Sequence, residues 1–123
     1  MSDRNAKEAF EPVNPGDILE KVAALPLSTW KYKTQDAGVR HIGPMAQDFK
    51  AAFAVGESDI GITSVDADGV ALAAIQGLNQ KVENSAQRAA AGMLALQAEN
   101  AELKARLDRL ERRLNEQLSQ GAR

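Results

Sequence analysis

A serine and a lysine near the N-terminus are the residues whose types could carry covalent chemistry. Ser2 and Lys7 bound the segment Ser-Asp-Arg-Asn-Ala-Lys. A neutral lysine can take the proton of a serine hydroxyl, which then attacks a carbonyl carbon. Positions this far apart on an α-helix are separated by about 140° around the axis. The pair therefore needs a turn, or partners from neighbouring subunits, to meet, and as a bare pattern it more often indicates a polar leader.

His41 is the only histidine of the chain, and no carboxylates cluster around it in the sequence. A lone histidine cannot build a metal site without such ligands, so we expect a hydrogen-bonded structural residue, with a direct catalytic role as the alternative. The apolar stripe of Met45, Phe49 and Phe53 indicates core packing and not a ligand pocket.

Residues 66–69, Asp-Ala-Asp-Gly, are similar to the start of a calcium-binding loop. The downstream glutamate that completes such a loop is missing, and residues 70–75 are mostly apolar. We therefore expect Asp66 or Asp68 to cap a helix. The sequence predicts no metal and no cofactor.

The composition limits what these residues can belong to. At 123 residues the chain has room for one small domain and a helix, and its aromatic content of 4% predicts a thin core that an oligomer would supplement. The net charge of -2 gives no field to attract nucleic acid or an anionic membrane. Without cysteine there are no disulfides or thiolate sites. We also expect no membrane span and no secretory signal.

The elements that must position the candidate residues follow from turn signals and apolar periodicity. Residues 1–16 are predicted to be an irregular leader. A short helix capped by Asp17, with Glu20 completing the capping box, should end at Pro26. The order expected after it is a strand over 28–33, a turn over 35–38, a returning strand over 39–42, a helix from Pro44 to Gly56, an extended stretch over 60–65 and a long helix over 70–118.

The long helix carries a heptad repeat, which is typical of helices that wind around partner helices. The a positions are Leu72, Asn79, Ala86, Met93, Asn100, Leu107 and Leu114; the d positions are Ile75, Val82, Ala89, Leu96, Leu103 and Leu110. Charges at g and e positions pair attractively between parallel neighbours, Glu99 with Lys104 and Arg106 with Glu111. The repeat therefore predicts a parallel oligomer but leaves its number open. The alternative is an amphipathic helix folded back on its own domain.

The predicted fold class is mainly α with a small β-hairpin. A compact N-terminal α+β head over residues 1–69 would precede a coiled-coil helix over 70–118 and a frayed tail over 119–123.

Three segments in this order resemble the intramolecular chaperone domain of endosialidases, phage tail fibres and spikes, which is the self-cleaving peptidase S74 family, related to the self-cleaving region of myelin regulatory factors. They are Ser2–Phe10, the pair Trp30–Tyr32 and His41–Phe49, and Val65–Ile75. Together with the coiled coil, the resemblance covers nearly the whole chain.

The resemblance implies a C-terminal module that forms a homotrimer, assists the folding of the upstream fibre or spike domain of the same polypeptide, and then cuts the bond preceding the serine. It would make Ser2 the nucleophile and Lys7 the general base, with Asp3 and His41 as candidate supporting residues. Met1 would be a remnant or an added start residue. The implied place of action is the bacterial host cytoplasm during virion or fibre assembly, with the product in the virion tail or at the cell surface.

Two other functions are compatible with the residues. The same fold could be a trimerisation and folding module that stays attached because its leader is inert. A coiled-coil adaptor for an unrelated partner is the third interpretation.

Overall fold

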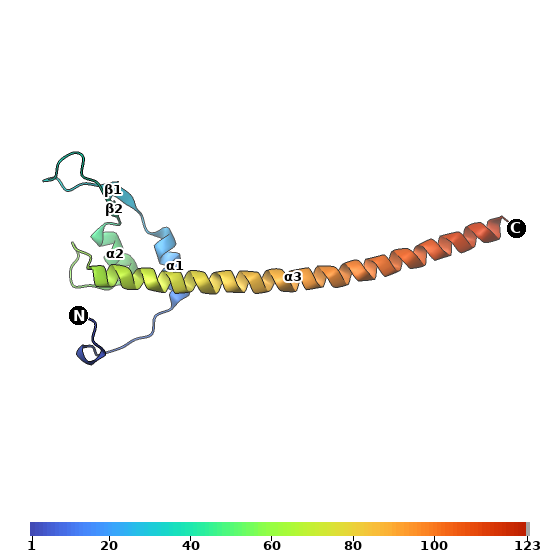
Figure 1. Ribbon diagram of the computed structural model, residues 1–123, viewed down its shortest axis with the longest axis horizontal. Helices are drawn as coiled ribbons and strands as arrows, with labels where there is room; N and C mark the ends of the chain where they lie inside the picture. The colour runs from blue at the N-terminus through green and yellow to red at the C-terminus, as the bar shows by residue number, and fades with distance from the viewer. Residues whose placement is uncertain (123) are drawn as a thin grey trace. The chain divides into compact units, whose positions relative to one another are not determined.

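A computed structural model of the protein describes residues 1–122 and is mainly helical, with one two-stranded sheet (Figure 1). Residues 1–82 form one compact unit, and the residues from Glu83 onward form a second. The elements in chain order are the 3-10 turn η1 Arg4–Ala6, α1 Pro15–Ala24, β1 Ser28–Trp30, β2 His41–Gly43, α2 Ala46–Phe53 and α3 Ser64–Gly121. The predicted element order is confirmed, with boundaries that differ in detail.

The first helix, α1, begins earlier than its sequence pattern predicts. Asn14 is the N-cap, and its side-chain Oδ1 accepts a hydrogen bond of 3.2 Å from the Asp17 backbone N–H. Pro15 follows at the first helical position, where its missing N–H costs no hydrogen bond. The expectation that Asp17 caps this helix is therefore wrong, because Asn14 already provides the oxygen.

A short antiparallel hairpin follows α1, as predicted, although both strands have only three residues. The register pairs Ser28 with Gly43, Thr29 with Ile42 and Trp30 with His41. Arg40 extends back over the hairpin and donates to the Thr29 carbonyl at 2.8 Å. Because a two-stranded sheet is marginal by itself, such side-chain bonds matter for holding the hairpin together.

Helix α2 supplies most of the apolar core. Phe49 and Phe53 are buried and pack with ring centroids 4.9 Å apart, as the sequence predicts, whereas Met45 remains 44% exposed at the N-cap. The helix ends at Ala54, which adopts the left-handed conformation with φ 52°. Gly56 was the expected stop and lies two residues further along, so that prediction is wrong: Ala54 ends the helix despite its Cβ.

The start of α3 is set by a threonine that the sequence pattern does not single out. The Thr63 hydroxyl donates to Asp66 Oδ2 at 2.7 Å and accepts from the Asp66 backbone N–H at 3.3 Å. The bond from the Asp66 backbone N–H to the Thr63 hydroxyl is the one that a helix N-cap makes, so the cap is Thr63, and the expectation that Asp66 or Asp68 is the cap is wrong. As a result α3 begins at Ser64 instead of 70, and Val65 is helical, not extended.

Helix α3 continues to Gly121, so residues 119–121 of the predicted tail are helical, and Arg123 lies outside the described residues. Its apolar a and d side chains are exposed, from 63% at Leu72 and 62% at Ile75 to 47% at Leu103. Within the first compact unit, the heptad residues Leu72 and Ile75 are therefore not covered by the head.

The head covers a different face of α3. Within the first compact unit the buried residues of α3 are Ala74 and Gly77, at heptad positions c and f. At 100° per residue these positions lie on the side of the helix opposite a and d. The exposed Leu72 and Ile75 therefore lie on the side of α3 away from the head, where another helix can pack against them.

Candidate functional site

The segment before α1 contains a single 3-10 turn, η1, that folds the leader back on itself. Asp3 is its N-cap, and the Asp3 side chain accepts a hydrogen bond of 3.0 Å from the Asn5 backbone N–H. The Lys7 N–H donates to the Arg4 carbonyl at 3.3 Å and closes the other end. Lys7 is the extended residue that follows this turn, and Ser2 directly precedes its N-cap. Asp3 therefore supports the candidate site by holding the turn, not by direct contact with Ser2.

The turn brings the two candidate catalytic side chains into contact within one chain. Lys7 Nζ donates to Ser2 Oγ at 2.7 Å. This distance is within the range in which a general base can take a proton from a nucleophile. An α-helix would place Ser2 and Lys7 on different faces. The 3-10 turn between them instead brings their side chains into contact. Both side chains are exposed to solvent.

Ser2 and Lys7 share an open hollow with three further residues. Arg4, Asn5 and Phe10 complete its lining, and its volume is about 550 Å³. A guanidinium and an amide are donors of the kind that stabilise an oxyanion in acyl transfer. Ala9 is left-handed with φ 55°, which turns the chain just before Phe10. Arg4, Asn5 and Phe10 lie inside the Ser2–Phe10 segment of the resemblance, but their types and spacing predict no role for them individually.

His41 belongs to the hairpin and not to the Ser2–Lys7 contact. Its Nε2 lies 3.0 Å from Gln35 Oε1, and its ring packs against Trp30 and Tyr32 with centroids 5.0 and 5.4 Å away. Gln35 Oε1 also accepts from the Tyr32 backbone N–H at 3.1 Å. These contacts fit the expectation of a hydrogen-bonded structural histidine. The structure does not bring His41 to Ser2 or Lys7 within hydrogen-bond distance.

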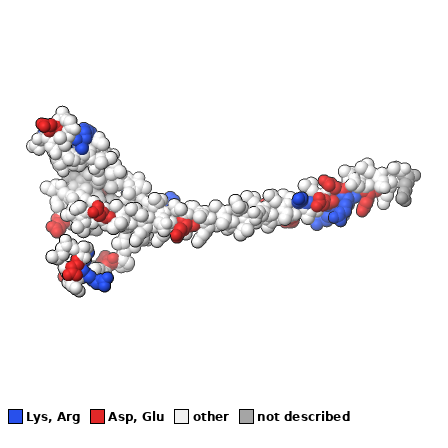
Figure 2. Space-filling model, in the orientation of Figure 1, with Lys and Arg blue, Asp and Glu red and all other residues white. Residues whose placement is uncertain are grey.

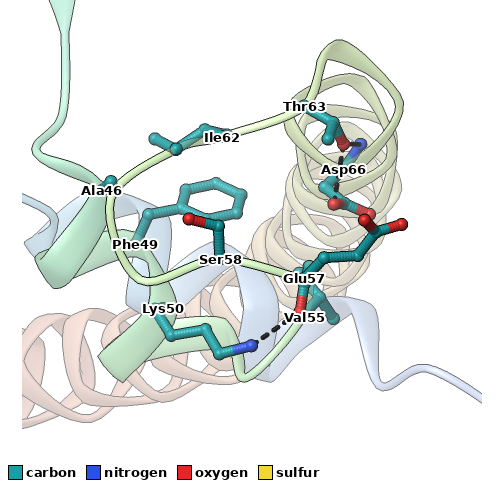
Figure 3. Close-up of a pocket in the computed structure, with 11 residues that line it drawn as sticks. Ala46, Phe49, Lys50, Val55, Glu57, Ser58, Ile62, Thr63 and Asp66 are labelled. Carbon is teal, nitrogen blue, oxygen red and sulfur yellow. Dashed lines mark hydrogen bonds between the residues drawn. The ribbon is translucent and has the colours of Figure 1, made fainter.

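A second, smaller cavity lies between α2, the loop after it and the first turn of α3, with a volume of about 150 Å³ (Figure 3). Phe49 and Ile62 contribute to its apolar lining. Two of its charged lining residues make local bonds: Lys50 Nζ donates to the Gly56 carbonyl at 2.7 Å, and Asp66 accepts from the Thr63 hydroxyl. These bonds hold the loop after α2 and the first turn of α3 in place. Glu57 is a third charged residue of the lining.

Neither a metal cluster nor a membrane-spanning helix occurs in the described part of the chain. Among residues 1–122 no three histidine, cysteine, aspartate or glutamate side chains are grouped so that they could hold a metal ion. Asp66 and Asp68 both lie in α3, and the calcium-loop interpretation has no support from their geometry. No described helix has the length and apolar character needed to cross a membrane.

A comparison with known families found one family model that matches the leader and much of the head. Residues 2–55 match the Peptidase S74 family, chaperone of endosialidase. This is the family that the sequence resembles, and the resemblance is confirmed over that range. The matched range includes the Ser2–Lys7 turn, the hairpin with His41, and α2. No curated protein matches the chain significantly.

The family match is shorter than the resemblance drawn from the sequence. It ends at residue 55, so the third quoted segment, Val65–Ile75, and the heptad repeat both lie beyond it. In the structure that third segment is the beginning of α3 and contains Ala74, which is buried in the head. A chaperone role is therefore supported by the head of the protein, while the role of the long helix has to be argued from its own residues.

Proposed function

We propose that this protein is a C-terminal intramolecular chaperone that forms a parallel trimer, assists the folding of an upstream fibre or spike domain, and releases itself by cutting the bond preceding Ser2. The observation that carries the proposal is the 2.7 Å contact between Lys7 Nζ and Ser2 Oγ, which occurs in a segment matching the chaperone-of-endosialidase family. Neither the hydrogen bond nor the match would carry the proposal alone.

The cleavage chemistry follows from the two atoms in contact. Neutral Lys7 accepts the Ser2 hydroxyl proton as Oγ forms a bond to the carbonyl carbon of the preceding residue. Lys7 then returns the proton to the leaving amide nitrogen, which becomes the Ser2 amine, and water hydrolyses the resulting ester. Arg4 and Asn5 line the same hollow, and a guanidinium and an amide are suited to stabilising the negative oxygen of the tetrahedral intermediate.

The exposed heptad face supports assembly of the helices. Leu107, Leu110 and Leu114 are 58%, 59% and 56% exposed, and burial of a leucine contributes about 1.5–3 kcal/mol. The charges that would flank this face in a parallel bundle gather toward the C-terminal part of α3, whereas most of the helix before them has few charges (Figure 2). The apolar face and these charges support parallel assembly in register; the number three comes from the family resemblance.

Trimerisation would help an upstream fibre because three separate chains lose much entropy on meeting. A bundle that holds the chains together raises their effective concentration. The entropy loss on pairing the strands of the upstream domain is therefore smaller. Cleavage afterwards removes the chaperone, which leaves the assembled fibre kinetically trapped.

The test is a longer precursor in which the natural upstream residues precede Ser2, compared with the same precursor carrying Ser2→Ala. On a denaturing gel the parent should give two fragments, with Ser2 as the new N-terminal residue of the smaller one by mass spectrometry. The Ser2→Ala precursor should remain one band on the gel. Its mass in solution should be that of an assembled, full-length precursor. A single uncut band for both proteins would refute self-cleavage.

The second candidate function is a trimerisation and folding module that stays attached to its fibre. The observation that favours it is the solvent exposure of Ser2 and Lys7, because water competes with the Lys7–Ser2 hydrogen bond. The exposed heptad face serves this function equally well. An uncut parent that still assembles into trimers with a folded upstream domain is the outcome expected from this alternative.

A further inference from the structure

At Gly77 the start of α1 lies very close to α3. A Cβ atom built on Gly77 would lie 2.3 Å from the Pro15 carbonyl oxygen, 2.8 Å from the Pro15 carbonyl carbon and 3.0 Å from Leu19 Cβ. Two of these atoms belong to the backbone, so no rotamer change can make room. Even an alanine at this position would force the start of α1 away from α3.

Intrinsic helix propensity does not account for a glycine at this position. Glycine is less favourable than alanine in a helix interior, and Gly77 lies well inside α3. Gly69 and Gly92 occupy the same helix, and a Cβ at either would meet nothing within 4 Å. Of these three glycines, Gly77 is the one at which close packing, against Pro15, leaves no room for a side chain.

The contact fixes the place where the leader joins the head. Pro15 is the first residue of α1, and Asn14, which precedes it, is the residue that caps the helix. The six residues from Glu8 to Val13 connect Asn14 to Lys7. Fully extended, that connection spans about 25 Å. Docking of Pro15 on Gly77 therefore limits how far the Ser2–Lys7 pair can move from α3.

We propose that Gly77 is a positioning residue for self-cleavage, which tethers the Ser2–Lys7 pair to the long helix through the start of α1. This inference rests on the proposed function. Gly77 is at heptad position f, opposite the exposed a and d residues, so its replacement displaces α1 without touching the surface that joins the helices. Cleavage and assembly should consequently separate in a Gly77 variant.

The experiment compares precursors carrying Gly77→Ala and Gly69→Ala, which make the same chemical change in the same helix. Cleavage is followed on a denaturing gel, mass in solution by sedimentation, and folding of the head by the fluorescence of Trp30, the only tryptophan. Gly77→Ala should cut about tenfold or more slowly than the parent at unchanged mass. Gly69→Ala should cut at the parental rate.

A second variant keeps the test decisive if Gly77→Ala unfolds the head. Six glycine and serine residues inserted between Glu11 and Pro12 would double the connection in an exposed, irregular part of the leader and leave the α1–α3 contact intact. If Gly77 acts as a tether, the insertion variant should be cut more slowly than the parent. If the role of Gly77 is purely structural, the insertion should leave the cleavage rate unchanged.

The outcomes separate this inference from the proposed function. A parent precursor that stays uncut overturns both. A parent that is cut, together with an insertion variant that is cut equally fast, overturns the tethering role alone. The same holds for a folded Gly77→Ala precursor that is cut at the parental rate.

Discussion

At the scale of the residue, the chemistry rests on one contact that a single 3-10 turn produces. Lys7 Nζ reaches Ser2 Oγ because Asp3 caps the turn between them. A lysine in this position could act as a base, or it could only hold the serine in place by donating a hydrogen bond. The two roles differ in whether Lys7 ever has to lose its proton, and a substitution can separate them.

Lys7→Arg in the longer precursor distinguishes a base from a donor. Arginine keeps the charge and the donors but remains protonated in proteins. If Lys7 is the base, cleavage should fall by about 100-fold or more, which is the usual contribution of a general base. The measurement is the fraction cut over time, with Trp30 fluorescence showing that the head is folded. Cleavage retained within severalfold would contradict the role of Lys7 as a base.

At the scale of the element, each helix of the head ends or begins through a local device. Asn14 caps α1, Thr63 caps α3, and Ala54 ends α2 in a left-handed conformation. The last of these is unfavourable, because an L-residue with a Cβ in this region costs about 1–2 kcal/mol relative to the right-handed helix. Since the buried Phe53 directly precedes Ala54, we infer that core packing holds this turn in place.

Ala54→Gly should stabilise the head by about 1 kcal/mol, because glycine adopts the left-handed conformation without a steric cost. Urea unfolding followed by Trp30 fluorescence measures the change. Ala51→Gly, at an exposed position inside α2, is the matched control and should destabilise by about 1 kcal/mol. Equal destabilisation by both substitutions would mean that residue 54 is not left-handed in solution.

At the scale of the whole molecule, the division of α3 into two faces is the central feature. The head packs on positions c and f at Ala74 and Gly77, while the apolar a and d residues remain exposed along the helix. An exposed apolar row of this length is unusual on a protein that stays monomeric. The two faces do not compete, so the head can fold on each helix and still leave the heptad face for assembly.

Leu107→Asp should dissociate the assembled protein. It removes a leucine worth about 2 kcal/mol or more of burial per chain and puts like charges at the same layer of a parallel bundle. Sedimentation equilibrium should show a shift toward the mass of one chain. Ala105→Asp introduces the same charge at position f, outside the apolar face, and should retain the parental mass. A Leu107→Asp protein that keeps the parental mass would mean that this face does not join the subunits.

The sequence by itself determined the order of elements, the hairpin, the Phe49 and Phe53 core and the heptad repeat, because these depend on local turn signals and on the period of apolar residues. It also indicated the family, through three segments taken together: Ser2–Phe10, the pair Trp30–Tyr32 and His41–Phe49, and Val65–Ile75. Helix starts were less predictable: Asn14 and Thr63 are ordinary polar residues until one sees which backbone N–H each accepts from.

Only the tertiary structure decided which residues meet. The contact between Ser2 and Lys7 depends on a turn whose dihedral angles the spacing does not specify. The role of Gly77 depends on α1, which is distant in sequence and reaches α3 only after the chain has folded. Heptad periodicity identified one face of α3, but it could not say that the head would occupy the opposite one, because that choice is made by packing between elements.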